Sequence, residues 1–163
     1  DATRIAIGVE SAGGTLSAVA ALHARDQGWP LALQLHITPG TLAHTNTASH
    51  KLFANGFLID AATIEWFFNH YLPQGQRHDW RFAPMDADDH EGLAPAFVLL
   101  AECDPLVDDG LAYADKLRAA GNAVELELVR GVTHDFIKLG RALPEAITAL
   151  DACAVALRRH LLA

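Results

Sequence analysis

The chain has 163 residues, 51% of them hydrophobic, which is enough for one domain with a sizeable core. Its 12 Lys and Arg against 20 Asp and Glu give a net charge of −8, which argues against nucleic acid as a partner. No apolar run approaches the ~18 residues that cross a bilayer, and the initial DATRIAIG lacks the features of a signal peptide. We therefore expect a soluble, cytoplasmic protein without a membrane partner.

The first half of the chain alternates strand and helix patterns and then becomes irregular. The strand predictions rest on short runs rich in Ile, Val and Leu, and the helix predictions on apolar residues recurring every three or four positions. Asp60 is placed to cap the second of the helices. The predicted elements are a strand over 4–9, a four-turn helix from Ser11 to about Gly28, a strand over 31–38, an irregular excursion after Gly40, a helix over 61–72 and a polar loop over 73–93.

The second half is more regular. It contains the apolar run PAFVLLAEC and the alternating run AVELELVRG, each followed by residues that favour a turn or a helix. The predicted elements are a strand over 95–103, a helix over 108–120, a strand over 123–131 and a helix from Pro144 to about Leu162. Strands that alternate with helices in this way predict an α/β fold, a mainly parallel sheet with helices on both faces.

Polar side chains stand where three of the predicted strands end. Ser11 follows the first strand, Asp104 the third and His134 the fourth. The carboxyl ends of parallel strands meet at one edge of a sheet, so a hydroxyl, a carboxylate and an imidazole are expected to converge there. Their order in the chain is that of the α/β-hydrolase catalytic triad, in which a sharp strand-to-helix turn lifts the serine above the sheet.

Small residues follow Ser11 in the sequence. Ala12, Gly13 and Gly14 leave room where the strand and the helix approach each other. The backbone amide of Ala12, at the start of the helix, is expected to point at a developing oxyanion.

Each member of the predicted triad also has an ordinary structural interpretation. Ser11 alone suits the N-cap of a helix, and Asp104 alone suits the cap of the helix after it. Asp108 and Asp109 favour the positive end of that helix, and His134 alone is most simply a structural histidine. The joint occurrence of all three residues in this order favours the triad.

The residues around Ser11 carry a resemblance to a known family. They read VESAGG, where the bacterial esterases of the hormone-sensitive lipase family usually have G-D-S-A-G-G. The segments FANGFLIDAATIEWFFNHYLP, CDPLVDDGLAYADKLRAAG and VRGVTHDF continue the likeness. The chain thus resembles, over almost all of its length, the carboxyl-terminal half of these esterases.

The resemblance implies a partial α/β-hydrolase fold over residues 1–163, with a helical cap inserted at about 40–75. It makes Ser11 the nucleophile, His134 the general acid and base, and Asp104 the group that orients the imidazole. The implied reaction is hydrolysis of carboxylic esters of short or medium acyl chain through an acyl-enzyme, without a metal or an organic cofactor. A non-catalytic small-molecule-binding module on the same fold is the alternative, and a purely structural fragment is a third interpretation.

Apolar residues near the cap and the strand ends are candidates for the substrate pocket. An alternative for Trp66 and Phe67 is simple packing of the cap helix. The candidates are Phe57, Leu58, Trp66, Phe67, Val107 and Phe136.

Two residues depart from the family pattern. Val9 stands where the family has glycine, and its branched side chain is expected to crowd the following helix and splay the turn at Ser11. Asp135 replaces the glycine that usually follows the histidine, and it is expected to raise the pKa of His134 or to compete for its hydrogen bond.

The family's amino-terminal half, with the His-Gly-Gly loop that completes the oxyanion hole, has no counterpart in this sequence. Its absence leaves the strand over 4–9 as an apolar edge. We therefore expect this half of the hydrolase to be a partner of the chain. The strand over 123–129 is expected to form the other edge, where a homodimer is predicted.

Neither the histidines nor the acidic residues predict a metal site. The nine histidines show no ligand spacing, and the acidic segment 86–91 lacks the glycine and glutamate of a calcium loop. Cys103 and Cys153 lie in apolar sequence and are expected to be reduced, buried thiols.

Overall fold

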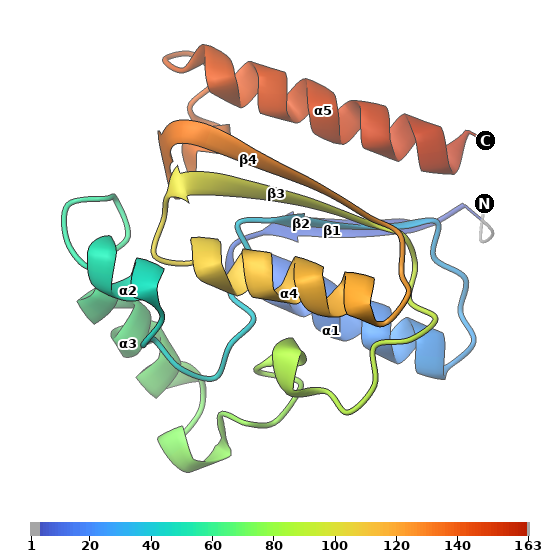
Figure 1. The fold of residues 1–163 in the computed structure, drawn as a ribbon, viewed down its shortest axis with the longest axis horizontal. Helices are drawn as coiled ribbons and strands as arrows, with labels where there is room; N and C mark the ends of the chain where they lie inside the picture. Colours follow the sequence, from blue (N-terminus) through green and yellow to red (C-terminus); the bar gives the residue numbers. More distant parts are fainter. Residues whose placement is uncertain (1–3, 163) are drawn as a thin grey trace.

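The four strands of the sheet are parallel and lie side by side in chain order (Figure 1). The computed structural model describes residues 4–162. The strands are β1 (Ala6–Glu10), β2 (Leu33–Ile37), β3 (Ala96–Cys103) and β4 (Val124–Thr133). The predicted parallel α/β fold is therefore confirmed.

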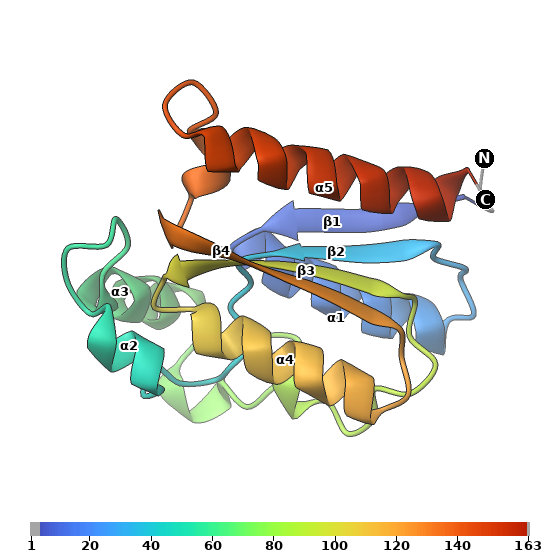
Figure 2. The same ribbon diagram turned by 45° about the horizontal axis from the view of Figure 1, so that its top comes forward.

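Helices cover both faces of the sheet (Figures 1 and 2). The helices α1 (Ala12–Asp26) and α4 (Val107–Ala119) lie on one face, and α5 (Pro144–Leu161) lies on the other. This arrangement follows from the connections, because successive crossovers between parallel strands pack their helices back onto the sheet. None of the helices within residues 4–162 has the length and apolarity that crossing a membrane requires.

A separate layer lies beyond the carboxyl ends of the strands. It contains α2 (Ala48–Leu52) and α3 (Ala61–Tyr71) (Figure 2). The Asp60 carboxylate caps α3 by accepting from the Thr63 amide at 2.7 Å, as the sequence predicts. The segment after Gly40 was expected to be irregular, but it contains α2, whose five residues are too few to show a helical period.

Two apolar cores sandwich the sheet. One joins β3 to α1 and α4 around Leu22, Val98 and Leu117, and the other joins β2 and β3 to α5 around Leu99 and Phe136. In β3 the first six residues are all buried, as expected of a strand covered on both faces. Burial of apolar surface in these two layers holds the strand ends, and the residues after them, in fixed positions.

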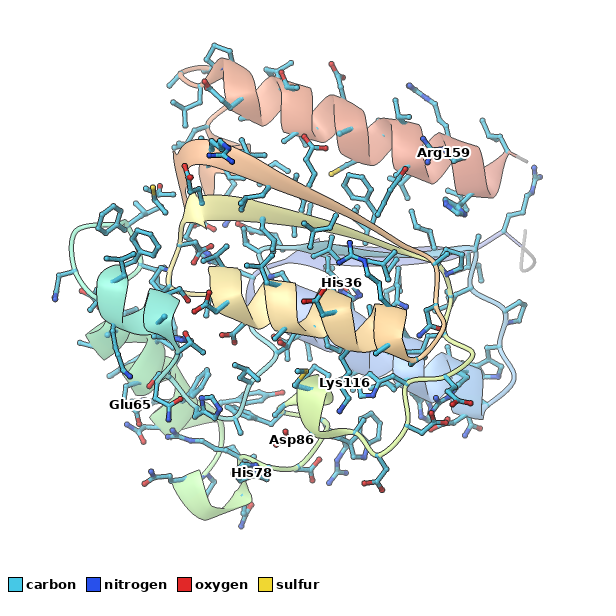
Figure 3. All side chains as sticks on the ribbon, viewed as in Figure 1. His36, Glu65, His78, Asp86, Lys116 and Arg159 are labelled. Atoms are coloured by element: carbon cyan, nitrogen blue, oxygen red, sulfur yellow. The ribbon has the colours of Figure 1, made fainter. Side chains whose placement is uncertain are left out.

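A polar side chain is enclosed in the core between the sheet and α4. His36 of β2 is fully buried, and its Nε2 lies 2.9 Å from Oε1 of Gln34 (Figure 3). Its ring packs edge-on against Tyr113 of α4, with 5.6 Å between centroids. Burial lowers the pKa of His36 to about 4, so the ring is neutral at pH 7 and serves as a packing and hydrogen-bonding element.

The long loop after α3 is held against α4. It contains the short helical turns Gln74–Gln76 and Pro84–Asp86. From α4, the ammonium of Lys116 donates to the backbone carbonyls of Met85 at 2.6 Å and Ala87 at 3.4 Å (Figure 3). The loop is thereby fixed in place although it lacks long elements of its own.

The outer strands of the sheet are β1 and β4. Beside and within β1, Ile5 is 46% exposed and Val9 is 53% exposed. These positions lie in the run that the sequence predicted to be an apolar edge, and the edge is confirmed. The cysteines are both unpaired thiols, with Cys153 buried and Cys103 partly buried.

Candidate active site

A strained turn places Ser11 between β1 and α1. Its backbone angles, φ 57° and ψ −124°, lie where side chains other than glycine are rarely found. Backbone hydrogen bonds hold the turn. The Ser11 amide donates to the Ile37 carbonyl at 2.8 Å, and the Ser11 carbonyl accepts from the amides of Gly14 at 2.8 Å and Thr15 at 3.3 Å. Ser11 occupies the N-cap position of α1, but its side chain makes no capping bond to the helix, so the hydroxyl is available for another partner.

The turn at Ser11 accommodates Val9 because Gly13 has no side chain. A Cβ atom at Gly13 would lie 2.3 Å from Cγ1 and 2.7 Å from Cβ of Val9. Val9 therefore fills the space above Gly13, and the expected splaying of the turn does not occur. Gly14 is needed for a similar reason, since a Cβ there would lie 2.9 Å from Cβ of Pro39.

This packing predicts that Gly13→Ala destabilises the protein. The Val9 Cβ is fixed by the backbone, so no rotation of the side chain relieves the contact, and the clash outweighs the gain in helix propensity. We expect the free energy of unfolding to fall by about 1–3 kcal/mol, measured by denaturant titration.

The double variant Val9→Gly/Gly13→Ala is expected to be less destabilised than the sum of its two single variants, because the clash is absent when position 9 is glycine. Gly75→Ala is the matched control, because nothing lies within 4 Å of a Cβ at Gly75. Additive effects of the two changes would contradict this account of the turn.

The side chains of Ser11, His134 and Asp104 form a continuous chain of hydrogen bonds. His134 Nε2 lies 2.8 Å from Ser11 Oγ, and His134 Nδ1 lies 2.7 Å from Asp104 Oδ2. The other carboxylate oxygen, Asp104 Oδ1, accepts from the Leu106 amide at 2.8 Å. In the tautomer that these contacts favour, Nδ1–H donates to Asp104 and Nε2 accepts the serine proton.

A shift in the strand register brings His134 to this position. The pairing of β3 and β4 is interrupted between Ala101 and Cys103, and β4 continues to Thr133 instead of ending near Gly131. A bulge of this kind bends a strand and re-aims the residues beyond it. The run AVELELVRG gives no indication of this shift.

The imidazole of His134 is enclosed and surrounded by negative charge. The side chain is 3% exposed and that of Asp104 is 1% exposed. Burial by itself disfavours the imidazolium, but the hydrogen bond and charge of Asp104, with further charge from Asp135 and Glu10, raise the pKa of His134. The ring is therefore a stronger base than an unpaired histidine in the same enclosure.

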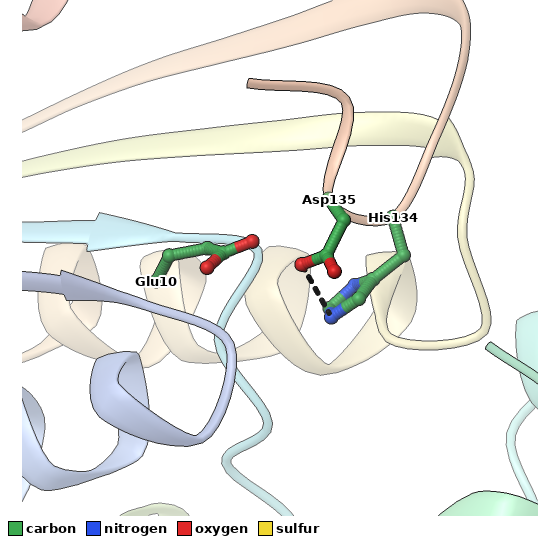
Figure 4. A group of neighbouring side chains, drawn as sticks. All are labelled: Glu10, His134 and Asp135. Atoms are coloured by element: carbon green, nitrogen blue, oxygen red, sulfur yellow. Dashed lines mark ion pairs between the residues drawn. The ribbon is translucent and has the colours of Figure 1, made fainter. Parts of the chain in front are cut away.

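A second charged cluster lies against the same imidazole. Figure 4 shows Glu10, at the end of β1, and Asp135, in the turn after β4, beside His134. Within residues 4–162 this is the one group of His, Cys, Asp and Glu close enough together to hold a metal ion. The ammonium of Lys138 already lies between the carboxylates, 2.7 Å from Asp135 Oδ1 and 2.9 Å from Glu10 Oε2.

A cavity of about 800 Å³ opens at Ser11 and extends along α3. Its wall is mainly apolar, with the charged cluster and His134 at one end. Of the predicted pocket residues, it includes Leu58 and Phe67. The lining residues beyond the predicted ones include Leu16, Leu42, Ile64, Phe68, Tyr71, Phe82 and Leu106.

The remaining predicted pocket residues lie elsewhere. Phe136 is fully buried in the core beneath α5, and Val107 belongs to the core beneath α4. Phe57 packs edge-on against Phe53, and Trp66, 56% exposed, packs against its neighbours on α3. The apolar stripe of α3 was the signal for the true lining, since Ile64, Phe68 and Tyr71 share it with Phe67.

The acidic residues of the DPLVDDG segment anchor the chain between β2 and α2 and the start of α2. Buried Asp109 accepts from the amides of Thr41 and Leu42 at 3.2 and 3.3 Å, and Asp108 accepts from the Ser49 amide at 2.8 Å. Burial raises the pKa of Asp109 to about 7. These residues thus do more than favour the positive end of α4.

Ala12 lines the cavity beside Ser11 as the first residue of α1. The first amides of a helix have no partner within the helix and carry a partial positive charge. The Ala12 amide is therefore suited to stabilise negative charge on a group bonded to Ser11 Oγ.

Comparison with known proteins agrees with this geometry. A family model described as alpha/beta hydrolase fold matches residues 1–138. The ethyl acetate hydrolase of Pseudomonas putida is 40% identical over 164 residues, covering 99% of this chain and 52% of that protein. The carboxylic ester hydrolase LipN of Mycobacterium tuberculosis is 41% identical over 165 residues, covering 97% of this chain and 44% of that protein.

Solved structures show the same relationship. The crystal structure of a thermostable esterase from Pseudomonas putida superposes with a TM-score of 0.93 at 36% identity, covering 98% of this chain and 52% of that one. The chain thus spans about half the length of the relatives that it matches. From the matching family model, these identities and the shared fold, we conclude that the chain belongs to the α/β-hydrolase fold family, in its hormone-sensitive lipase group.

Proposed function

We propose that this chain carries the catalytic triad of a carboxylesterase that hydrolyses esters of short or medium acyl chain. The observation that carries the proposal is the hydrogen-bonded series Ser11, His134 and Asp104 at the mouth of an apolar cavity. The esterase names of the relatives support the reaction class.

In the proposed reaction Ser11 Oγ attacks the ester carbonyl carbon while His134 Nε2 takes the hydroxyl proton. Asp104 holds the imidazole in the required tautomer and stabilises the imidazolium. The Ala12 amide donates to the oxyanion. The imidazolium then gives its proton to the leaving alcohol, and a water molecule, activated by His134 in the same way, releases the acid from Ser11.

We also propose that the chain is the carboxyl-terminal portion of one α/β-hydrolase domain, with the cap as an insertion at about 40–75. The exposed edge of β1 and the share of the relatives' length that the chain covers support this. An amino-terminal half would pair with β1 and contribute a further oxyanion donor, and loss of one such donor costs about 100- to 1000-fold in turnover. The predicted homodimer through residues 123–129, in the other edge strand, remains a proposal.

Covalent labelling of the full-length protein with a fluorophosphonate probe tests the proposed function. We expect one phosphonyl group per chain, located on Ser11 by peptide mass spectrometry, because only an activated serine attacks such a probe. Ser11→Ala is expected to lose the label, whereas Ser17→Ala, a matched change on α1, is expected to keep it.

The same experiment separates catalysis from binding. Tight binding of an ester analogue without labelling of Ser11 would contradict the esterase assignment and favour the non-catalytic binding module.

A further inference from the structure

A carboxylate lies close to the reactive nitrogen of His134 without bonding to it. Asp135 Oδ1 is 3.9 Å from His134 Nε2, the same nitrogen that lies 2.8 Å from Ser11 Oγ. The first distance is too long for a hydrogen bond but short enough for a strong interaction between charges. The separation therefore decides whether Asp135 supports the imidazole or withdraws it from Ser11.

Two neighbouring side chains restrain Asp135. Lys138 Nζ lies 2.7 Å from Oδ1, the oxygen nearest to His134, and also 2.9 Å from Glu10 Oε2. Glu10 is partly buried, and this burial together with the neighbouring Asp135 carboxylate raises the pKa of Glu10. Asp135 is thus held by the Lys138 ammonium, which Glu10 in turn holds in place.

The backbone at Asp135 gives independent evidence of this constraint. Its φ is 63°, in the left-handed region that favours glycine. A side chain kept in this conformation next to the site points to a role for the carboxylate, because glycine would fit the turn with less strain.

From this geometry, we propose that Lys138 and Glu10 hold Asp135 as a second carboxylate partner of His134, near enough to stabilise the imidazolium and too far away to displace Ser11. Asp135, Lys138 and Glu10 are positioning residues in this arrangement, which rests on the proposed esterase function.

The restraint on Asp135 affects the proton that His134 takes from Ser11. After Ser11 gives its proton to His134, Nε2–H must donate to the leaving oxygen for the acyl-enzyme to form. An unrestrained Asp135 would accept this proton in a charge-assisted bond and compete with the leaving group. Lys138 prevents this by occupying Asp135 Oδ1, while the negative charge nearby still favours the imidazolium.

The groups that face His134 come from several elements. Asp104 approaches Nδ1 from the end of β3, Glu10 from the end of β1, and Asp135 from the turn that carries His134 itself. The other histidine that lines the cavity is His70 of α3. A change at Asp135 therefore leaves Asp104 and Glu10 beside the ring.

Steady-state hydrolysis by the full-length protein, with the variants Lys138→Met, Asp135→Asn and the double variant, tests the proposal. We expect Lys138→Met to lower kcat about tenfold, the effect of roughly one charge-assisted hydrogen bond, with KM changed less than about twofold. The double variant is expected to recover kcat to within about threefold of Asp135→Asn, because no carboxylate is left to compete. Lys138→Arg is expected to retain most of the activity.

A pH profile adds a readout that a purely structural role would not move. The acidic limb of the rate of fluorophosphonate labelling is expected to shift to lower pH in Asp135→Asn, by about half a pH unit. Lys51→Met and Asp115→Asn, exposed charges that do not line the cavity, are matched controls that should leave kcat and the profile unchanged.

The outcomes separate this proposal from the proposed function. The positioning role would be overturned by a double variant as slow as Lys138→Met, or by an acidic limb that does not move in Asp135→Asn. Labelling of the unaltered protein would still support the esterase. Absence of labelling in the unaltered protein would instead remove the esterase assignment, and the positioning role with it.

Discussion

Replacing Ser11 with alanine is expected to lower kcat/KM for ester hydrolysis by roughly 10⁴- to 10⁶-fold in the full-length protein. The reason is geometric, since Ser11 Oγ is the hydroxyl within 2.8 Å of His134 Nε2. A p-nitrophenyl ester of short acyl chain, followed by its absorbance, provides the measurement. KM is expected to change far less than kcat because the cavity wall is kept.

Ser17→Ala is the matched control for this loss. Ser17 is buried further along α1, and its hydroxyl donates to the Gly13 carbonyl at 3.0 Å. Alanine is a better helix former than serine, so the control is expected to retain activity within about threefold. Hydrolysis that survived Ser11→Ala at a comparable rate would rule out Ser11 as the nucleophile.

The second large effect is expected from Asp104→Asn, which should lower kcat by roughly 10⁴-fold. The Asp104 carboxylate accepts hydrogen bonds from His134 Nδ1 and from the Leu106 amide. An asparagine keeps the shape but presents an amide donor, which favours the tautomer that carries its proton on Nε2. His134 then lacks a lone pair with which to accept the serine proton.

Asp115→Asn, an exposed carboxylate of α4, is the matched control and should leave kcat unchanged. A thermal unfolding curve for each variant separates catalysis from stability. The expected result is a large loss of kcat in Asp104→Asn while the folded fraction at the assay temperature remains complete. A loss of less than about tenfold would argue against the role of Asp104 in setting the tautomer.

The sheet was predictable because its strands are marked by local sequence. The runs that form β2 and β3 are short, apolar and bounded by turn residues, and buried parallel strands have that pattern. The turn at Ser11 was predictable for a related reason, since a serine followed by three small residues between a strand and a helix is typical of a tight turn that exposes the hydroxyl.

The side chains that surround the triad could not be predicted from the local sequence. Glu10 and Lys138 meet across more than a hundred residues, and their contact depends on the path of the chain after β4. Phe136 and Phe67 are both aromatic residues that the sequence placed in the pocket, but one is buried beneath α5 and the other lines the cavity. Packing between elements decides which of these aromatic residues is buried and which lines the cavity. The spacing of apolar residues along the sequence does not indicate it.

The close fit between Val9 and Gly13 couples the two positions. With valine at position 9, a Cβ atom at position 13 would clash, so valine there is compatible only with glycine at position 13. A redesign of this turn must therefore change position 9 before position 13.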